Sequence, residues 1–255
     1  MRKIFAFLCA LSFAAQFNLL SAQYAMKAWK NGSVTASIPT ADLDSVTFSR
    51  IYYVINGHKF IDLGLPSGVL WAETNIGAET AADDGNYYAW GETATKSDYS
   101  WSTYKYGDAS SLSSNLTKYN STDGKTFLEI SDDAASVNWG SSCRMPTKED
   151  FDELLNSKNC TWTWTSMENS SGDSIKGYTV TSKKYGNSIF LPTSGCHYGD
   201  NLNGNGAYGD YWSSTLNTSN LGNAYYLCFS NNINIRRTKY NYRYIGSTVR
   251  PVADP

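Results

Sequence analysis

The stretch WGSSCRMPTKEDFDELL, at residues 139–155, constrains the fold of this chain more than any other part of the sequence. Pro146 ends any regular element that precedes it, because its ring and missing amide hydrogen interrupt a helix or strand. The hydroxyl of Thr147 can accept a hydrogen bond from the free amides of a first helical turn, and Asp150 stands where a capping box needs an acid. The sequence therefore predicts a helix that starts at Thr147.

The side chains of this helix indicate what it packs against. Phe151, Leu154 and Leu155 recur at spacings i, i+3 and i+4, so they share one apolar face. The remaining positions are charged and stay in water: Lys148, Glu149, Asp152 and Glu153. The rest of the chain reads as short strands rich in Tyr, Trp, Val and Thr, and these predict a sheet that covers the apolar face.

Charge and composition limit the class of partner. The 255 residues carry a formal charge of -2 with a pI near 5.7, whereas a phosphate-binding surface needs a basic excess, so we expect no nucleic-acid partner. Charged residues make up only 17 % of the chain and aromatic residues 15 %. The surface must therefore consist largely of Asn, Ser, Thr, Gly and Tyr, which suit adaptable hydrogen bonding and flat contact.

The N-terminus has the pattern of an export signal. Arg2 and Lys3 precede an apolar run at residues 4–15, and the small residues Ser21 and Ala22 offer a cleavage site. We expect residues 1–22 to be removed and the mature protein to be secreted or held at the outer cell surface. No other stretch approaches the roughly 18 continuous apolar residues of a membrane helix, so we expect no transmembrane span in the mature chain.

Four cysteines follow the signal: Cys143, Cys160, Cys196 and Cys228. An even number in an oxidising compartment is typical of disulfides, and three pairings are open. Buried free thiols are the alternative, because cysteine is among the most buried residue types.

Turn signals and alternating apolar residues divide most of the chain into short strands. Asn31 with Gly32 predicts a hairpin in the N-terminal segment, followed by a strand at residues 44–48, and Asn56 with Gly57 predicts a second hairpin. Further strands are expected at residues 69–72, 160–166, 176–182, 188–193, 211–215, 224–230 and 247–252. Residues 93–126 have almost no aliphatic side chains, so we expect a long surface excursion there.

Six blocks in chain order carry a family resemblance: DLGLPSGVLWAETNIGA, YYAWGET, DDAASVNWGSSCRMPTKEDFDELL, GNSIFLPTSG, GDYWSST and GSTVRPV. Together they resemble the Fibrobacter succinogenes major paralogous domain, a family of secreted bacterial domains. The resemblance implies an α+β, C-type-lectin-like fold with few helices, small twisted antiparallel sheets and long irregular loops that carry the function. It divides the chain into a signal peptide (1–22), an N-terminal β-hairpin-like segment (23–50) and the domain itself (51–255).

Motifs for metal binding and catalysis are sparse. In C-type lectins, which the family resembles, tripeptides of the EPN, QPD or WND type supply calcium ligands. None of these tripeptides occurs here. We therefore expect no cofactor and keep calcium as an alternative. Two histidines and no CxxC spacing give no support for zinc. Formylglycine-generating enzymes, which share the broad fold, use a cysteine pair, so Cys196 and Cys228 define a thiol-oxidase alternative.

The C-terminal loops combine flat aromatic side chains with hydrogen-bonding groups, a mixture suited to sugar rings or a protein surface. The predicted ligand-binding residues are Tyr198, Asp200, Asn201, Asn203, Tyr208, Arg236, Arg237, Tyr240 and Tyr242. For each of them ordinary loop solvation is the alternative. The sequence thus favours a non-catalytic recognition protein for a glycan or a cell-surface protein. A structural or assembly component of the cell envelope is the second interpretation, and the thiol oxidase the third.

Overall fold

The computed structural model describes residues 25–40, 52–107, 115–231 and 235–254, and the chain divides into two compact units, Met1–Phe48 and Ser49–Pro255. In the first unit, β1 (Ala25–Lys30) and β2 (Ser33–Pro39) form an antiparallel hairpin that turns at Asn31 and Gly32, as the sequence predicts. The strand expected at residues 44–48 lies outside the described residues.

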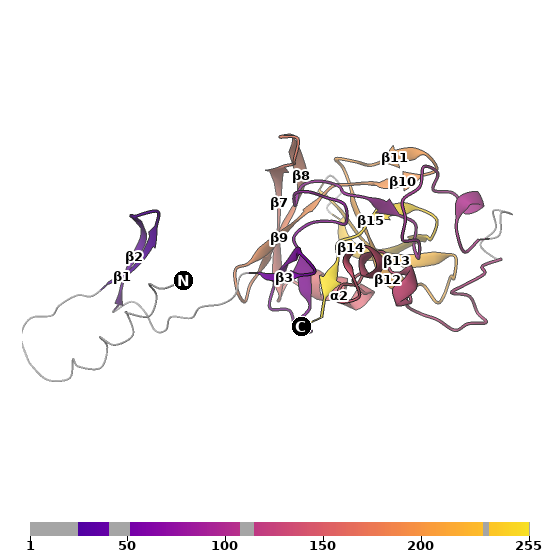
Figure 1. The fold of residues 1–255 in the computed structure, drawn as a ribbon, viewed down its shortest axis with the longest axis horizontal. Helices are drawn as coiled ribbons and strands as arrows, with labels where there is room; N and C mark the ends of the chain where they lie inside the picture. Colours follow the sequence, from indigo (N-terminus) through magenta and orange to yellow (C-terminus); the bar gives the residue numbers. More distant parts are fainter. Residues whose placement is uncertain (1–24, 41–51, 108–114, 232–234, 255) are drawn as a thin grey trace, which may run out of the picture. The chain divides into compact units, whose positions relative to one another are not determined.

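The described part of the second unit contains three small sheets (Figure 1). The first has the order β16-β5-β4-β3, from β3 (Tyr53–Ile55), β4 (His58–Asp62), β5 (Leu70–Ala72) and β16 (Val252–Ala253). The second is a meander of β7 (Cys160–Glu168), β8 (Ser174–Ser182) and β9 (Ser188–Pro192). All strand pairs in these two sheets are antiparallel.

The third sheet is the largest and has the order β11-β10-β15-β12-β13-β14, with β6 paired to β15. Its strands are β6 (Tyr87–Tyr88), β10 (Cys196–Tyr198), β11 (Asn201–Asn203), β12 (Gly209–Leu216), β13 (Asn223–Ser230), β14 (Ile235–Tyr242) and β15 (Gly246–Thr248). The strand expected at residues 247–252 is in fact two strands, β15 and β16. Between them Pro251 has no amide hydrogen to donate, and its carbonyl accepts the Ala72 amide at 2.9 Å.

Helix is a minor component. The described helices are α1 (Ala134–Trp139), α2 (Lys148–Leu155) and the short 3-10 helices η2 (Trp101–Thr103) and η3 (Ile130–Asp132). With 10 % helix against 42 % strand, the described part of the chain consists mostly of small antiparallel sheets with few helices, which is compatible with an α+β class. None of the helices in the described ranges is long and apolar enough to cross a membrane.

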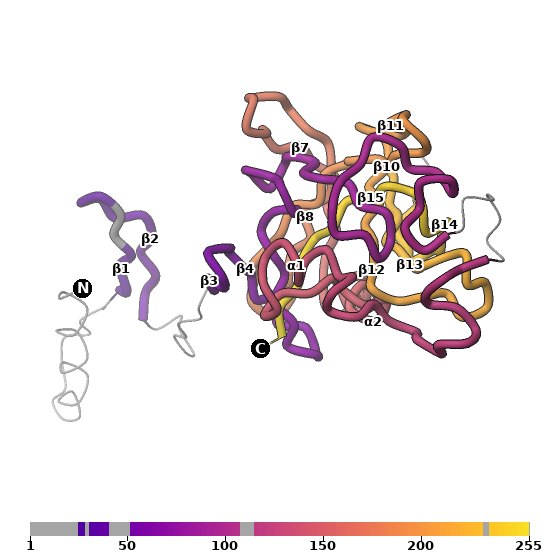
Figure 2. Tube along the Cα trace, turned by 45° about the vertical axis from the view of Figure 1, so that its right-hand side comes forward, coloured from indigo at the N-terminus to yellow at the C-terminus, as the bar shows by residue number. Residues whose placement is uncertain are grey.

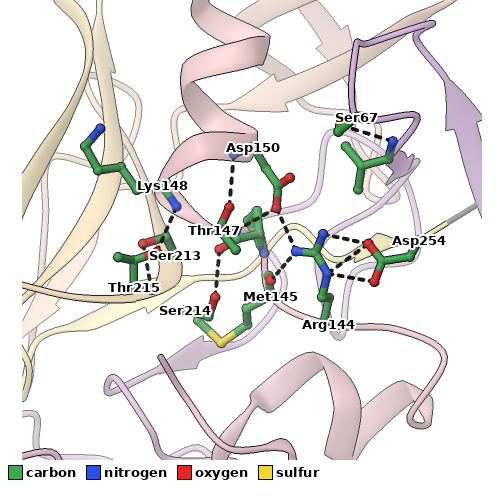
Figure 3. A network of polar contacts seen from close by, with 12 residues as sticks. Ser67, Arg144, Met145, Thr147, Lys148, Asp150, Ser213, Ser214, Thr215 and Asp254 are labelled. Atoms are coloured by element: carbon green, nitrogen blue, oxygen red, sulfur yellow. Dashed lines mark hydrogen bonds and ion pairs between the residues drawn. The ribbon is translucent and has the colours of Figure 1, made fainter. Parts of the chain in front are cut away.

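The start of α2 confirms the predicted capping box. The Asp150 amide donates to the Thr147 hydroxyl at 3.1 Å, and the Asp150 carboxylate accepts the Thr147 amide at 2.8 Å. Arg144 extends this network, because its guanidinium donates to Asp150 at 2.6 Å and to Asp254 at 2.7 Å (Figure 3). One arginine therefore connects the first turn of the helix to the last described residue of the chain.

The apolar face of α2 is covered as predicted. Phe151 and Leu154 are fully buried, and Leu155 is half-buried. The Phe151 ring lies 5.5 Å from that of Trp71 in β5, and the same core cluster includes Leu227 of β13. The helix therefore sits where the first sheet and the large sheet meet.

The described residues between 93 and 126 lie mostly at the surface, as expected from their composition, but five of their side chains reach the core. Tyr99, Tyr104, Tyr106 and Tyr119 are buried in the main core cluster, as is Leu116 at its edge. Composition did not predict this burial, because tyrosines can enter a core when they find polar partners there. For Tyr104 and Tyr119 that partner is Arg243.

Arg243 is fully buried and surrounded by polar and aromatic groups. Its Nε donates to the Tyr104 hydroxyl at 2.8 Å, and its Nη atoms donate to the carbonyls of Lys118 (3.1 Å), Tyr119 (3.2 Å) and Leu221 (3.1 Å). The guanidinium carbon lies 4.8, 5.3 and 5.6 Å from the ring centroids of Trp90, Tyr104 and Tyr119. Carbonyl oxygens and aromatic faces together solvate the charge in place of water.

A second polar centre, Asp132 in η3, attaches the same segment from the other side. Its carboxylate accepts the Tyr119 hydroxyl at 2.7 Å and pairs with Lys118 and with Lys105. Burial by itself would raise the pKa of Asp132, but hydrogen bonds from Lys118, Tyr106 and Tyr119 outweigh it and lower the pKa to about 2.

Replacing Arg243 by Met should lower the free energy of unfolding by about 3 kcal/mol, because three buried carbonyls lose their donor at once. Urea denaturation measures the effect. Arg237→Met is the matched control, since Arg237 is exposed on β14, and it should change stability by no more than about 0.5 kcal/mol. Equal stability of the two variants would show that Arg243 does not hold the segment.

Acid should reveal the contribution of Asp132. Its folded pKa is below the unfolded value, so its stabilisation, about 1 to 2 kcal/mol, is complete above about pH 4 and is lost as the pH falls towards 2. Asp132→Asn should therefore be less stable than wild type at neutral pH, and the gap should narrow at low pH. The exposed Asp152→Asn serves as control, and a gap of constant size between pH 7 and 2 would contradict the assignment.

Candidate functional site

The hairpin of β10 and β11 forms one end of the large sheet. Tyr198 pairs with Asn201, so Gly199 and Asp200 make a two-residue turn, and Gly199 has the positive φ of 64° that such a turn requires. Gly199 also pairs with Tyr99, each amide donating to the other carbonyl at 2.8 Å. In both ribbon and tube views the hairpin lies at the opposite end of the unit from α2 (Figures 1 and 2).

Four aromatic side chains meet beside this hairpin, and we call them the aromatic platform: Trp101, Tyr198, Tyr242 and Tyr244. The Tyr242 ring stacks on that of Tyr244 with centroids 5.5 Å apart and an angle of 12°. Trp101 lies 4.9 Å from Tyr244, and Tyr198 lies 5.7 Å from it on an inclined plane. Tyr198 is 57 % exposed and Tyr242 47 %, whereas Tyr244 is buried beneath them.

The buried ring of the platform stays uncharged. Burial raises the pKa of the Tyr244 hydroxyl above its usual range, and a hydrogen bond with Tyr198 raises it further. Tyr244 thus stays protonated at any physiological pH. Exposed rings packed on a buried ring lose little conformational freedom when a ligand covers them.

Acidic and amide groups border the platform. Asp98 accepts the Ser100 hydroxyl at 3.0 Å, and one of its oxygens lies 4.0 Å from the position that a Cβ on Gly199 would take. Asp200 accepts the side-chain amide of Asn201 at 2.7 Å. Carboxylate and amide groups therefore lie next to flat aromatic surface, an arrangement that can accept hydrogen bonds from hydroxyls above the rings.

The structure brings together some of the predicted site residues and separates the others. Tyr198, Asp200, Asn201 and Asn203 lie on the hairpin, and Tyr242 joins them through Tyr244. Tyr208 follows in the next loop, where its ring covers Gly204.

The three remaining predicted residues lie on β14 outside the platform. Arg236 donates to the Trp162 carbonyl at 3.4 Å and lies over the Tyr178 ring. The Tyr240 ring lies 6.4 Å from that of Tyr225. Arg237 is exposed opposite Cys228.

Sequence reasoning missed Trp101, Tyr244 and Asp98. Trp101 and Asp98 lie in the segment that was expected to be a surface excursion, so nothing linked them to the hairpin. Tyr244 lies in the turn after β14, which ends at Tyr242, so the alternation of side chains along the strand does not predict its position.

The four described cysteines are free thiols, and the pair singled out as an oxidase candidate is separated by an acid. Cys228 is the cross-strand partner of Asp210, and the bridge between Gly195 and Gly209 places Cys196 on its other side. The Asp210 carboxyl group forms side-chain hydrogen bonds with both thiols and so lies between them.

The electrostatic setting of these thiols disfavours nucleophilic chemistry. Burial, together with the nearby carboxyl group of Asp210, raises the pKa of Cys196 and that of Cys228 to about 12. A reactive cysteine needs the opposite change, because the thiolate is the nucleophile. In the described ranges no group of three His, Cys, Asp or Glu side chains is placed to hold a metal ion.

Thiol labelling tests this description. A thiol-specific aromatic disulfide reagent near neutral pH should react with the folded protein more than about tenfold slower than with the same protein in guanidinium chloride, since the thiolate fraction falls with each unit of raised pKa. Cys196→Ser and Cys228→Ser should leave the slow rate of the folded protein unchanged. Fast reaction of two thiols in the folded protein would revive the oxidase interpretation.

The family resemblance rests on the sequence blocks alone. Comparisons with protein-family models, with curated proteins and with solved structures found no match.

Proposed function

We propose that the protein is an exported, non-catalytic recognition protein that binds glycans on its aromatic platform. In this proposal residues 51–255 form a C-type-lectin-like domain of the Fibrobacter succinogenes major paralogous family, and residues 1–22 are a cleaved export signal. The observation that carries the proposal is the pair of exposed rings, Tyr198 and Tyr242, fixed from below by Tyr244 and Trp101.

The chemistry of the platform favours a sugar. Each sugar ring has an apolar face of C–H groups that can lie on an aromatic ring, and hydroxyls at its edge that need acceptors and donors. The platform supplies the rings, and the loop before Trp101 and the turn after Tyr198 supply hydrogen-bonding groups in Asp98, Asp200 and Asn201. The two carboxylates would repel an acidic sugar, so neutral glycans are the favoured class.

The raised pKa values of Cys196 and Cys228 support the non-catalytic part of the proposal, because they leave little thiolate for oxidase chemistry. Calcium stays as an alternative mode of sugar binding. Its involvement is a question for the experiment, which therefore includes a chelator.

The test is binding of the purified protein to a broad glycan panel, with calcium and again with chelator. Tyr198→Ala and Tyr242→Ala should each weaken binding of a neutral glycan by about tenfold, because each removes a stacking surface. Tyr240→Ala is the matched control, since Tyr240 is 58 % exposed on the same strand as Tyr242 but lies outside the platform.

Three outcomes would contradict the proposal: no glycan bound by folded protein, equal loss in the Tyr240→Ala control, or preference for acidic glycans. If the folded protein binds no glycan of the panel, a protein partner becomes the favoured ligand. Loss of binding on addition of chelator would instead add calcium to the site.

A further inference from the structure

A second candidate site lies in the second unit, away from the aromatic platform. A cavity of about 380 Å³ opens between β3, the loop that joins β4 to β5, and the turn between β8 and β9. This volume is within the range of small-molecule sites, about 300 to 1,000 Å³. Its apolar lining includes Ile55, Leu65 and Leu70, and its charged lining includes Asp62 and Lys184.

The wall of the cavity is built by a close approach of two loops. The Asn187 side-chain amide donates to the Asp62 carbonyl at 2.9 Å, which docks the turn between β8 and β9 onto the end of β4. The Tyr185 ring then lies only 2.7 Å from where a Cβ on Gly64 would be, and Gly64 has a φ of 60°. The positive φ favours glycine at this position, and a larger residue would also displace the Tyr185 ring.

The acids and the lysine of the cavity differ in how they are neutralised. Asp254 is already paired, because Arg144 donates to its two oxygens at 2.7 to 3.2 Å (Figure 3). Asp62 uses one oxygen to accept the Gly64 amide at 2.7 Å. Within the described ranges neither Asp62 nor Lys184 forms an ion pair, and the Lys184 ammonium lies over the Tyr185 ring at 4.9 Å.

The cavity therefore offers one free negative and one free positive group beside an apolar floor. A ligand with a single charge would satisfy one of these groups and repel the other. A neutral ligand would leave both without a charged partner. A zwitterion with an apolar body satisfies both groups and fills the floor.

We propose that this cavity binds an α-amino acid with an apolar side chain. The ammonium of the amino acid pairs with the Asp62 carboxylate, the carboxylate pairs with the Lys184 ammonium, and the side chain packs on Ile55, Leu65 and Leu70. Tyr185 covers the ligand from the side of the turn. No covalent step is involved.

The test uses calorimetric titration of the purified protein with L-phenylalanine and L-leucine, and with two derivatives of phenylalanine. The methyl ester removes the negative charge and the N-acetyl form removes the positive charge. On wild type, each derivative should bind about tenfold more weakly than the free amino acid.

Charge-neutral variants identify the partner of each group. The Lys184→Met variant should bind phenylalanine and its methyl ester equally well, because the partner of the carboxylate is gone. The Asp62→Asn variant should bind phenylalanine and its N-acetyl form equally well, because the partner of the ammonium is gone. Lys183→Met is the matched control, because Lys183 is exposed on the same turn but does not line the cavity, and it should bind like wild type.

The inference fails if neither amino acid binds more tightly than about 10 mM. It also fails if the ester binds wild type as well as the free acid does, or if Lys183→Met loses as much affinity as Lys184→Met. Circular dichroism of each variant confirms that a loss of binding does not reflect unfolding. The glycan experiment is independent, because none of these residues belongs to the aromatic platform.

Discussion

The charge of Arg243, buried without a carboxylate partner among the described residues, is the constraint on which the rest of the domain depends. A guanidinium in the core is costly unless every donor finds an acceptor. Here the acceptors are the Tyr104 hydroxyl and carbonyls from residues 118, 119 and 221, so segments far apart in the chain must converge on one side chain. The rings of Trp90 and Tyr119 complete the shell.

The aromatic platform is a consequence of this convergence. Arg243 lies between Tyr242 and Tyr244 in the chain, and its hydrogen bond to Tyr104 holds the end of the segment that carries Trp101. The pairing of Tyr99 with Gly199 then joins that segment to the β10–β11 hairpin. In general, a surface that is ordered before binding loses less entropy when a ligand binds to it.

Buried polar groups serve different purposes in this domain. Asp132 is stabilised as a carboxylate by several donors, whereas Asp210 lies between two thiols and burial raises its pKa. The first arrangement fastens a loop to the core. The second places a carboxyl group between Cys196 and Cys228, whose raised pKa values keep both thiols protonated.

The sequence by itself determined the elements whose causes are local. Capping by Thr147 and Asp150 specifies the start of α2, and asparagine with glycine specifies the turns at residues 31 and 56. Tertiary structure decided the rest. Contacts between distant segments decide which tyrosines of residues 99–106 are buried and why Trp101 groups with Tyr198 and Tyr242. They also decide that Arg236 and Tyr240 lie elsewhere. Tyrosine and arginine side chains are stable both in water and in a core that offers polar partners. Whether such a residue is exposed or buried therefore depends on the neighbours that the folded chain brings to it.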